Sequence, residues 1–308
     1  MKRNMVKTLM TAICTLLLIG MTAQAADLAQ GIGLESVGNA RELGGYASED
    51  GRVVKSGVLL RTASLNGATE ADLRRLKDDY HLAVVIDLRT TTEIEPAPDP
   101  EIDGVENIQL RIIDEAAMAE KRQTLSAEDV EGLDLTQKTD QLKLAMKLGI
   151  ISDHMYIDFL SGDQGRESYA RMFRELLGLP EGEALLFHCT QGKDRTGCAA
   201  MLILSALGVD EATILEDYLL TNTFNAALIE RERQMLVDAG LEGDELTLYM
   251  TAMDKVDPQY MINALDWMKD NYGSVLGYIS EELSVTEAEI EQLKDKYLED
   301  AVEYENAA

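Results

Sequence analysis

The chain has 308 residues, of which 46% are hydrophobic and 27% are charged, and its formal net charge at pH 7 is −28. A chain of that length can bury a substantial hydrophobic core. The negative charge disfavours nucleic acid or an anionic membrane surface as a partner, because both would be repelled by the average field of the protein. A small phosphorylated ligand stays compatible with this charge, since helix ends and local cations can reverse the potential inside one pocket.

The first 25 residues have the composition of a secretory signal. Lys2, Arg3 and Lys7 precede an apolar segment at residues 9–21, and Ala-Gln-Ala at residues 23–25 provides a small-residue cleavage site. The alternatives are a membrane anchor or the first helix of the fold, but the apolar segment is short for a membrane span. We therefore predict cleavage after Ala25, a secreted or periplasmic protein, and no stable membrane insertion after cleavage.

The next part of the chain alternates between predicted strands and helices. A loop rich in glycine and polar residues leads to a strand at 58–61, a helix at 69–80, a buried strand at 83–86 and a further strand at 108–113. This order is typical of an α/β fold in which helices flank a central, largely parallel sheet. We predict that residues 26–308 form a single domain.

Residues 114–153 are polar and helical in composition, with no strand signal. Some forty residues are long for a connection, so they predict a helical insertion, either a lid or an extra helical pair on the surface. One or two helices at 156–179 then lead to an apolar strand at 184–187 and an apolar helix at 196–206. The C-terminal region is predicted to be helical, with helices at 210–225, 226–240, 258–272 and 286–301.

Residues 186–197, Leu-Phe-His-Cys-Thr-Gln-Gly-Lys-Asp-Arg-Thr-Gly, connect that strand to that helix. Unpaired backbone N–H groups and the positive end of the helix dipole meet at a helix N-terminus, where they favour a bound dianion. The same environment favours a thiolate, so Cys189 is placed to be a nucleophile.

Cleavage of a phosphate ester needs a nucleophile, groups that neutralise the phosphate oxygens and an acid for the leaving group. Cys189 can form a phosphocysteine, and Arg195 has a planar fork of donors that matches two phosphate oxygens. Backbone N–H groups can bind the remaining oxygens, Gly192 allows a tight turn, and Thr196 can hydrogen-bond the thiolate. We therefore predict phosphate or substrate binding by Thr190, Gln191, Gly192, Lys193, Thr196 and Gly197.

Each of three charged or titratable residues near Cys189 and Arg195 is compatible with two roles. Asp194 is either a salt-bridged structural group or the general acid, and its spacing from Arg195 does not decide between them. Lys193 is a second cation that suits a substrate with another phosphate or acidic neighbour, or else an exposed lysine. His188 either orients the loop and favours the thiolate or is a hydrogen-bonded core histidine.

Other chemistries fit the sequence less well. A disulfide between Cys189 and Cys198 is disfavoured, because Cys198 lies in the apolar helix. Three histidines in the whole chain are too few for a Cys/His zinc site, so we predict chemistry without a metal or another cofactor. The nucleotide-binding pattern Gly-x4-Gly-Lys-Ser/Thr is broken by Phe187 and Asp194, which excludes ATP or GTP hydrolysis by that motif.

Residues 188–197 resemble the signature loop His-Cys-x-x-Gly-Lys-Asp-Arg-Thr-Gly of the bacterial tyrosine-protein phosphatase family. Asn-Ala-Arg-Glu-Leu-Gly-Gly-Tyr at 39–46 is similar to that family's Asn-Phe-Arg-Asp-Leu-Gly-Gly-Tyr, with departures at Ala40 and Glu42. Further similar segments lie, in order, at residues 60–65, 85–89, 217–222 and 272–278. The resemblance covers nearly all of the chain after residue 25.

This resemblance implies a protein tyrosine phosphatase-like fold, with Cys189 as nucleophile, Arg195 as phosphate binder and Asp194 as general acid from within the loop. It links Lys193 to phosphoinositide substrates and implies supporting roles for His188, Asp87 and Arg89. Some family members carry a helical lid where residues 114–153 fall. The implied substrates are phosphotyrosine in proteins or peptides, in some members phosphoserine or phosphothreonine, and phosphoinositides.

We therefore predict a secreted, cysteine-dependent phosphatase that acts on phosphomonoesters, above all on protein phosphotyrosine. One alternative is an inositol polyphosphate phosphatase, which shares the loop chemistry. A rhodanese-type sulfurtransferase is less favoured, because Lys193, Asp194 and Arg195 suit phosphate better than a persulfide. A non-catalytic phosphate-binding module would be expected to lose Cys189 or Arg195, and both are present.

Overall fold

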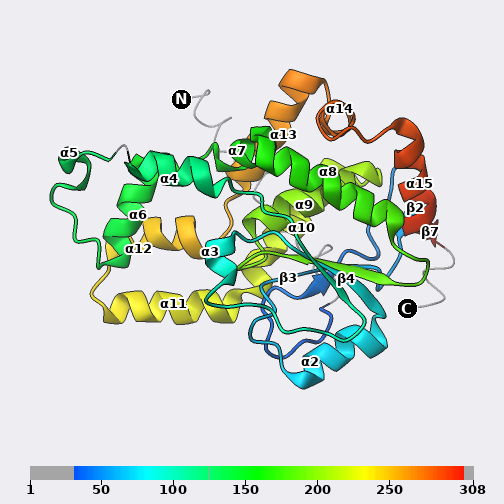
Figure 1. Cartoon of the computed structure of the whole chain (residues 1–308), viewed down its shortest axis with the longest axis horizontal. Helices are drawn as coiled ribbons and strands as arrows, with labels where there is room; N and C mark the ends of the chain where they lie inside the picture. The colour runs from blue at the N-terminus through cyan, green and yellow to red at the C-terminus, as the bar shows by residue number, and fades with distance from the viewer. Residues whose placement is uncertain (1–30, 124, 302–308) are drawn as a thin grey trace, which may run out of the picture.

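The computed structural model describes residues 31–301 apart from residue 124, so the predicted signal sequence lies outside the described residues. A sheet lies at its centre (Figure 1). It has five strands in the order β1-β3-β6-β4-β5. The last four strands in this order are parallel, and β1 is antiparallel to β3. The predicted α/β fold with a mostly parallel sheet is confirmed. The strands are β1 (Arg41–Glu42), β3 (Leu59–Thr62), β4 (Leu82–Asp87), β5 (Glu106–Gln109) and β6 (Ala184–His188).

The central strand β6 is buried along its whole length, which explains its unbroken apolar sequence. Its last residue, His188, lies opposite Thr62 of β3 and Asp87 of β4. The carboxyl ends of three parallel strands therefore meet at one edge of the sheet, which is where ligands bind in open α/β folds. Cys189 follows β6 at this edge.

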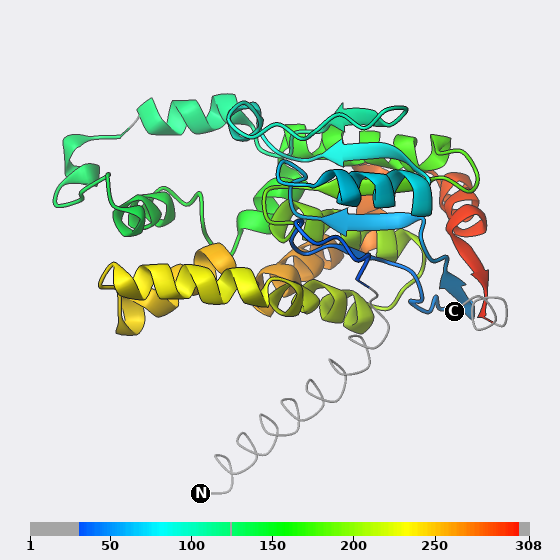
Figure 2. The ribbon, with the colours of Figure 1, turned by 90° about the horizontal axis from the view of Figure 1, so that it is seen from below.

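Helices cover both faces of the sheet (Figures 1 and 2). Alternate residues of β6 point to opposite faces. Leu186 joins the core under η1 (Arg75–Asp79), which continues α2 (Glu70–Arg74), whereas Leu185 and Phe187 join the larger core around the C-terminal helices. The helices of that larger core are α7 (Met155–Ser161), α8 (Asp163–Gly178), α9 (Asp194–Ala206), α10 (Glu211–Phe224), α13 (Pro258–Tyr272), α14 (Val275–Glu281) and α15 (Glu287–Tyr297).

The insertion predicted at residues 114–153 is helical, and with the segment after α10 it extends beyond the edge of the sheet, at the left of Figures 1 and 2. Leu142, Ile229, Leu236, Tyr249 and Met250 form a separate small core there. We call these elements the accessory helices: α4 (Glu115–Gln123), α5 (Ala127–Val130), α6 (Lys138–Lys147), α11 (Ala226–Asp238), α12 (Gly243–Tyr249) and the π-helical η2 (Met250–Asp254). Among the described residues, none of the helices is both long and apolar enough to cross a membrane.

Two predicted elements differ from the structure for reasons of long-range pairing. The strand predicted at 108–113 is β5, which ends at Gln109 because its partner β4 ends opposite it at Asp87. The helix predicted at 286–301 ends at Tyr297. The residues after it form β7 (Leu298–Asp300), which pairs with β2 (Arg52–Val54) in a second, two-stranded sheet.

Candidate active site

The loop that follows β6 begins at Cys189 and ends at Asp194, where α9 begins. Gly192 in this loop has a φ of +66°, and a Cβ atom there would lie 2.4 Å from the carbonyl oxygen of Thr62. Glycine is therefore required for both the turn and its close approach to β3. The backbone N–H groups of residues 190–193 donate to no other described residue, so together with the start of α9 they can bind an anion.

Side chains behind the loop fix the orientation of its peptide groups. Asn39 Nδ2 donates to the carbonyl oxygen of Gly192 at 2.7 Å, and Arg61 Nη2 donates to the same oxygen at 3.0 Å. The C=O and N–H of one peptide unit point in opposite directions. Holding this carbonyl on one side of the loop therefore directs the N–H of Lys193 to the other side.

A buried ion-pair network anchors these side chains. Asp217 of α10 accepts a hydrogen bond from Arg41 Nε at 3.0 Å and from the Tyr46 hydroxyl at 3.2 Å, and it also pairs with Arg61. The side chains of Arg41 and Arg61 are 0% exposed, and that of Asp217 is 1% exposed. Burial opposes the charged form of Asp217, but Arg41 and Arg61 outweigh it and hold the pKa of Asp217 below its ordinary value.

Arg195, in the first turn of α9, forms a bidentate ion pair with Glu93 of the short helix α3 (Thr91–Ile94). Arg195 Nη1 lies 2.6 Å from Glu93 Oε2, and Nη2 lies 2.7 Å from Oε1. The Thr190 hydroxyl donates to the same carboxylate at 2.6 Å. Glu93 therefore positions the guanidinium group that the sequence predicts to bind phosphate.

Burial opposes the charged form of Glu93, but the bonds from Arg195 outweigh it and hold the pKa of Glu93 below its ordinary value. Burial likewise lowers the pKa of Arg195, but the contact with Glu93 outweighs it and raises that pKa above its ordinary value. Glu93 was not identified from the sequence. The pattern Thr-x-x-Glu at residues 90–93 signals a capping box at a helix start, which is present, but does not signal a contact 102 positions away.

One buried tyrosine bonds to Asp194, and a second bonds to the first. The Tyr156 hydroxyl of α7 donates to Asp194 Oδ1 at 2.6 Å, and it lies 2.8 Å from the Tyr218 hydroxyl of α10. Arg195 pairs with Glu93, which disfavours the reading of Asp194 as the ion-pair partner of Arg195. The other oxygen, Oδ2, lies 3.8 Å from Lys193 Nζ, so Asp194 also forms an ion pair within the loop. A carboxyl group fixed beside the loop in this way is compatible with a role as proton donor.

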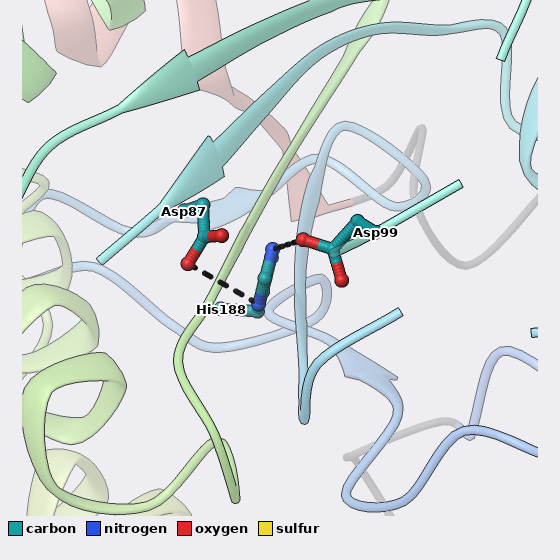
Figure 3. Close-up of side chains that lie close together, drawn as sticks. All are labelled: Asp87, Asp99 and His188. Carbon is teal, nitrogen blue, oxygen red and sulfur yellow. Dashed lines mark ion pairs between the residues drawn. The ribbon is translucent and has the colours of Figure 1, made fainter. Parts of the chain in front are cut away.

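His188 lies between the carboxylates of Asp87 and Asp99 (Figure 3), with Nε2 3.0 Å from Asp99 Oδ2 and Nδ1 3.9 Å from Asp87 Oδ1. Its Nδ1 also lies 3.2 Å from the carbonyl oxygen of Cys189. Ligand atoms of the three side chains lie within 4.8 Å of one another, a spacing that a metal ion could use. Arg89 donates to Asp87 at 2.8 Å and to Asp99 at 2.7 Å. The guanidinium group therefore supplies the positive charge, and the cluster is an ion-pair network.

Within this network burial opposes the charged form of Asp99, but His188 and Arg89 outweigh it and hold the pKa of Asp99 below its ordinary value. The structure thus brings together the three residues with predicted supporting roles, His188, Asp87 and Arg89, directly behind Cys189. Asp99 was missed, because it lies in the proline-rich turn at residues 96–100, where the sequence signals only a change of direction.

A pocket of about 620 Å³ opens over the loop. Much of its wall is apolar and comes from α7 and from the accessory helices with their adjoining segments. These apolar residues include Met118, Ile150, Ile151, Met155, Phe159 and Met253. The predicted insertion therefore contributes to the pocket, and its movement as a lid stays a prediction.

Most of the predicted loop residues line this pocket, namely Cys189, Thr190, Gln191, Lys193, Asp194 and Arg195. Thr196 and Gly197 do not, because α9 begins two residues earlier than predicted and places them inside the helix. The Thr196 hydroxyl forms no hydrogen bond with any described residue, so the predicted bond to Cys189 is not present. Gly197 instead allows close packing against Tyr218. Cys189 and Cys198 are both free thiols.

Comparison with known proteins agrees with this geometry. The sequence model of the tyrosine phosphatase family matches residues 32–299. A protein of Cupriavidus necator named as a tyrosine-protein phosphatase is 31% identical over 282 residues, which span 90% of this chain and 92% of that relative. The triple specificity protein phosphatase of Mycobacterium tuberculosis is 29% identical over 123 residues, or 38% of this chain and 44% of that relative. A tyrosine-protein phosphatase of Nostoc commune is 28% identical over 165 residues, or 54% of this chain and 48% of that relative. The chain belongs to the tyrosine phosphatase family.

Proposed function

We propose that this phosphatase hydrolyses phosphotyrosine in proteins or peptides through a phosphocysteine intermediate at Cys189. The observation that carries the proposal is the placement of this thiol in an anion-binding loop that lines a largely apolar pocket. The loop amides and Arg195 bind the phosphoryl oxygens, and the apolar wall accommodates the aromatic ring of the substrate.

The reaction has two steps. In the first, Cys189 Sγ attacks phosphorus, the bond from phosphorus to the phenolic oxygen breaks, and Asp194 gives its proton to the leaving oxygen. In the second, water attacks the phosphocysteine and gives a proton to Asp194, and the Cys189 thiolate leaves as inorganic phosphate forms. Glu93 keeps Arg195 in place, and Tyr156 keeps Asp194 in place.

Charge in the pocket favours this substrate class over inositol polyphosphates and phosphoinositides. Five carboxylate side chains line the pocket, against three cationic side chains. Of these cations, Arg195 is assigned to the phosphoryl group that is transferred, and Lys193 is already bonded to backbone carbonyls. A substrate with several phosphate groups would therefore meet more negative than positive charge.

Turnover of p-nitrophenyl phosphate and of a phosphotyrosine peptide, measured with a chelator present, tests the proposal. We expect Cys189→Ser to lower turnover by at least on the order of 10⁴-fold, as loss of a catalytic nucleophile does. Cys198→Ala is the matched control, because Cys198 is a buried thiol in α9 outside the pocket. Mass spectrometry of rapidly quenched enzyme should show one added phosphoryl group on the peptide that contains Cys189. Activity that persists in Cys189→Ser would exclude this mechanism.

We also propose that the protein is exported and cleaved after Ala25, on the basis of its N-terminal sequence alone. N-terminal sequencing of the protein from its native host should find Ala26 as the first residue. An intact Met1 on the active protein would contradict export by this route.

A further inference from the structure

Lys193 precedes α9 directly, yet its side chain is only 5% exposed. The Nζ atom donates to three backbone carbonyl oxygens, of Met253 at 2.9 Å, Lys255 at 3.1 Å and Ala252 at 3.3 Å. An ammonium group has three N–H donors and no acceptor. These three carbonyls therefore use every donor of Lys193, and none is left for a substrate phosphate. Asp194 Oδ2 lies 3.8 Å from the same Nζ atom and balances part of its charge.

The three carbonyls lie at the end of the helical segment formed by α12 and η2, where Lys255 is the C-cap. The last carbonyls of a helix have no partner within it and carry the negative end of the helix dipole. A buried ammonium group is unfavourable unless it is fully bonded. The cation and the helix end therefore satisfy each other, and a phosphate could claim Lys193 only by leaving these carbonyls unpaired.

This contact joins two parts of the site. η2 packs through Met250 into the core of the accessory helices, and its residues Ala252 and Met253 line the pocket. Lys193 lies four residues after Cys189 in the loop at residues 189–194, which we call the catalytic loop on the basis of the proposed function. The position of the pocket wall relative to the nucleophile thus depends on one buried side chain.

We propose that Lys193 is a positioning residue, which docks the pocket wall formed by η2 against the catalytic loop, and that it does not bind a second phosphate of the substrate. The proposal rests on the proposed phosphatase function of Cys189. It replaces the role in phosphoinositide binding that the sequence resemblance implies for this lysine, and it makes Lys193 a determinant of how the aromatic part of the substrate is held.

The kinetic test compares Lys193→Met with Lys193→Arg on three substrates: a phosphotyrosine peptide, and short-chain phosphatidylinositol mono- and bisphosphates. We expect Lys193→Met to raise KM for the peptide about tenfold, the equivalent of about 1.4 kcal/mol, with a smaller change in kcat. Its effects on any turnover of mono- and bisphosphate should be equal within about twofold. Lys193→Arg keeps a cationic donor and should restore part of the affinity. If Lys193→Met lowered turnover of the bisphosphate at least about tenfold more than turnover of the monophosphate, the proposal would be overturned. Unchanged kinetics on all three substrates would also overturn it.

The matched control is Lys296→Met. Lys296 Nζ donates to the carbonyls of Leu176 and Leu177 near the end of α8, so it bonds to helix carbonyls in a similar way but outside the pocket. This variant should leave the kinetics unchanged. A KM change equal to that of Lys193→Met would attribute the effect to general loss of stability and overturn the proposal.

Two further measurements separate docking from other roles. In a double-mutant cycle with Met253→Ala, Lys193→Met should raise KM for the peptide less in the Met253→Ala background than in the wild type, because both substitutions act through the same pocket wall. Additive effects of the two substitutions on KM would contradict a shared action through the pocket wall. Hydrogen exchange at residues 250–256 should become faster in Lys193→Met and stay unchanged in Lys296→Met. Hydrogen exchange is measured without substrate. If the wild type is inactive, the proposed function is refuted, whereas exchange at residues 250–256 still tests docking by Lys193.

Discussion

The catalytic loop and the accessory helices are held together by different means. Behind the loop, Arg41, Arg61 and Asp217 are at most 1% exposed and bond to one another. In the accessory helices, ion pairs such as Lys143 with Glu245 are half exposed. Five of the six large hydrophobic residues described as exposed also lie in or beside those helices: Leu135, Met146, Met235, Val237 and Leu248. The proposed chemistry thus rests on a buried core, while part of the pocket wall belongs to a region whose ion pairs and large apolar side chains are more exposed.

This difference indicates that the two regions have separate roles within one site. A nucleophile and its anion-binding loop need fixed geometry, because small displacements reduce the rate steeply. A wall that admits a peptide side chain can open locally at a smaller free energy, since regions with few buried apolar contacts unfold separately from the core. Substitutions in each region test whether the two regions differ in this way.

The largest effect is expected for Asp217→Asn. This change leaves Arg41 and Arg61 buried without their carboxylate, and removing one partner of a buried ion pair lowers the free energy of unfolding by about 3–5 kcal/mol. Urea denaturation should show the loss. The surface control Glu245→Gln removes a half-exposed partner of Lys143 and should change stability by less than about 1 kcal/mol. Equal losses for the two variants would show that the core network does not anchor the fold.

Leu142→Ala tests the accessory helices directly. Leu142 is 5% exposed in their small core, and truncation of a buried leucine lowers the free energy of unfolding by about 2–5 kcal/mol. We expect the low end of this range, confined to the accessory helices. Hydrogen exchange should accelerate in α6, α11 and α12 but not in β4 or β6, and KM should rise without a change in the Cys189 chemistry. Faster exchange in the sheet as well would show that the two regions unfold as one unit.

Acid should affect a buried carboxylate of the sheet-flanking helices and an exposed one of the accessory helices differently; these are Asp72 of α2 and Asp129 of α5. Burial opposes the charged form of Asp72, but hydrogen bonds from Ser36, Glu35 and Thr69 hold its pKa at about 2. Because this folded pKa lies below the unfolded value of 3.8, the stabilisation is complete above about pH 4 and is lost as the pH falls through 2. Asp72→Asn should therefore lower the free energy of unfolding by about 2 kcal/mol at pH 6, and the two proteins should converge near pH 2.

Asp129 of the accessory helices is the matched control. Hydrogen bonds from Ser126 and an ion pair with Lys147 also lower its pKa to about 2. This pair lies at the surface, where water and salt screen it, so the pKa shift overstates its contribution to stability. Asp129→Asn should show a much weaker dependence of stability on pH than Asp72→Asn, and added salt should remove it. A steeper dependence of stability on pH for Asp129→Asn than for Asp72→Asn would contradict the expected difference between the exposed and the buried carboxylate.

The sequence predicts the core better than the contacts that complete the site. Local apolar runs indicated β4, β6 and α9, and the segment from the end of β6 into the first turn of α9 indicated Cys189, Asp194 and Arg195. The partners of those residues come from distant segments. Glu93 lies 102 positions from Arg195, Tyr156 lies 38 positions from Asp194, and the carbonyl of Met253 lies 60 positions from Lys193. Each of these partners has an ordinary local role as a helix cap, a buried aromatic or a backbone group, so no local pattern distinguishes it.

The smallest expected effect concerns Tyr156, which belongs to the core but meets the pocket through Asp194. Tyr156→Phe keeps the ring packed and removes the hydrogen bond of 2.6 Å to Asp194 Oδ1. Negative charge develops on Asp194 as it gives up its proton, and a hydrogen bond to a charged group contributes about 1.5 kcal/mol. Without this bond the rate of a step that needs Asp194 as acid should fall about tenfold. Phenyl phosphate, a poor leaving-group substrate, should show this loss in kcat. p-Nitrophenyl phosphate needs little protonation of its leaving group and should show much less.

Tyr278→Phe provides the control, because it removes an equally buried hydroxyl that donates to the carbonyl of Leu160 at 2.8 Å, with no bond to Asp194. Its effect on the two substrates should be equal. Equal losses on both substrates in Tyr156→Phe would mean that Tyr156 only packs. A selective loss for phenyl phosphate would instead place the control of proton donation in the rigid core, separate from substrate admission by the accessory helices.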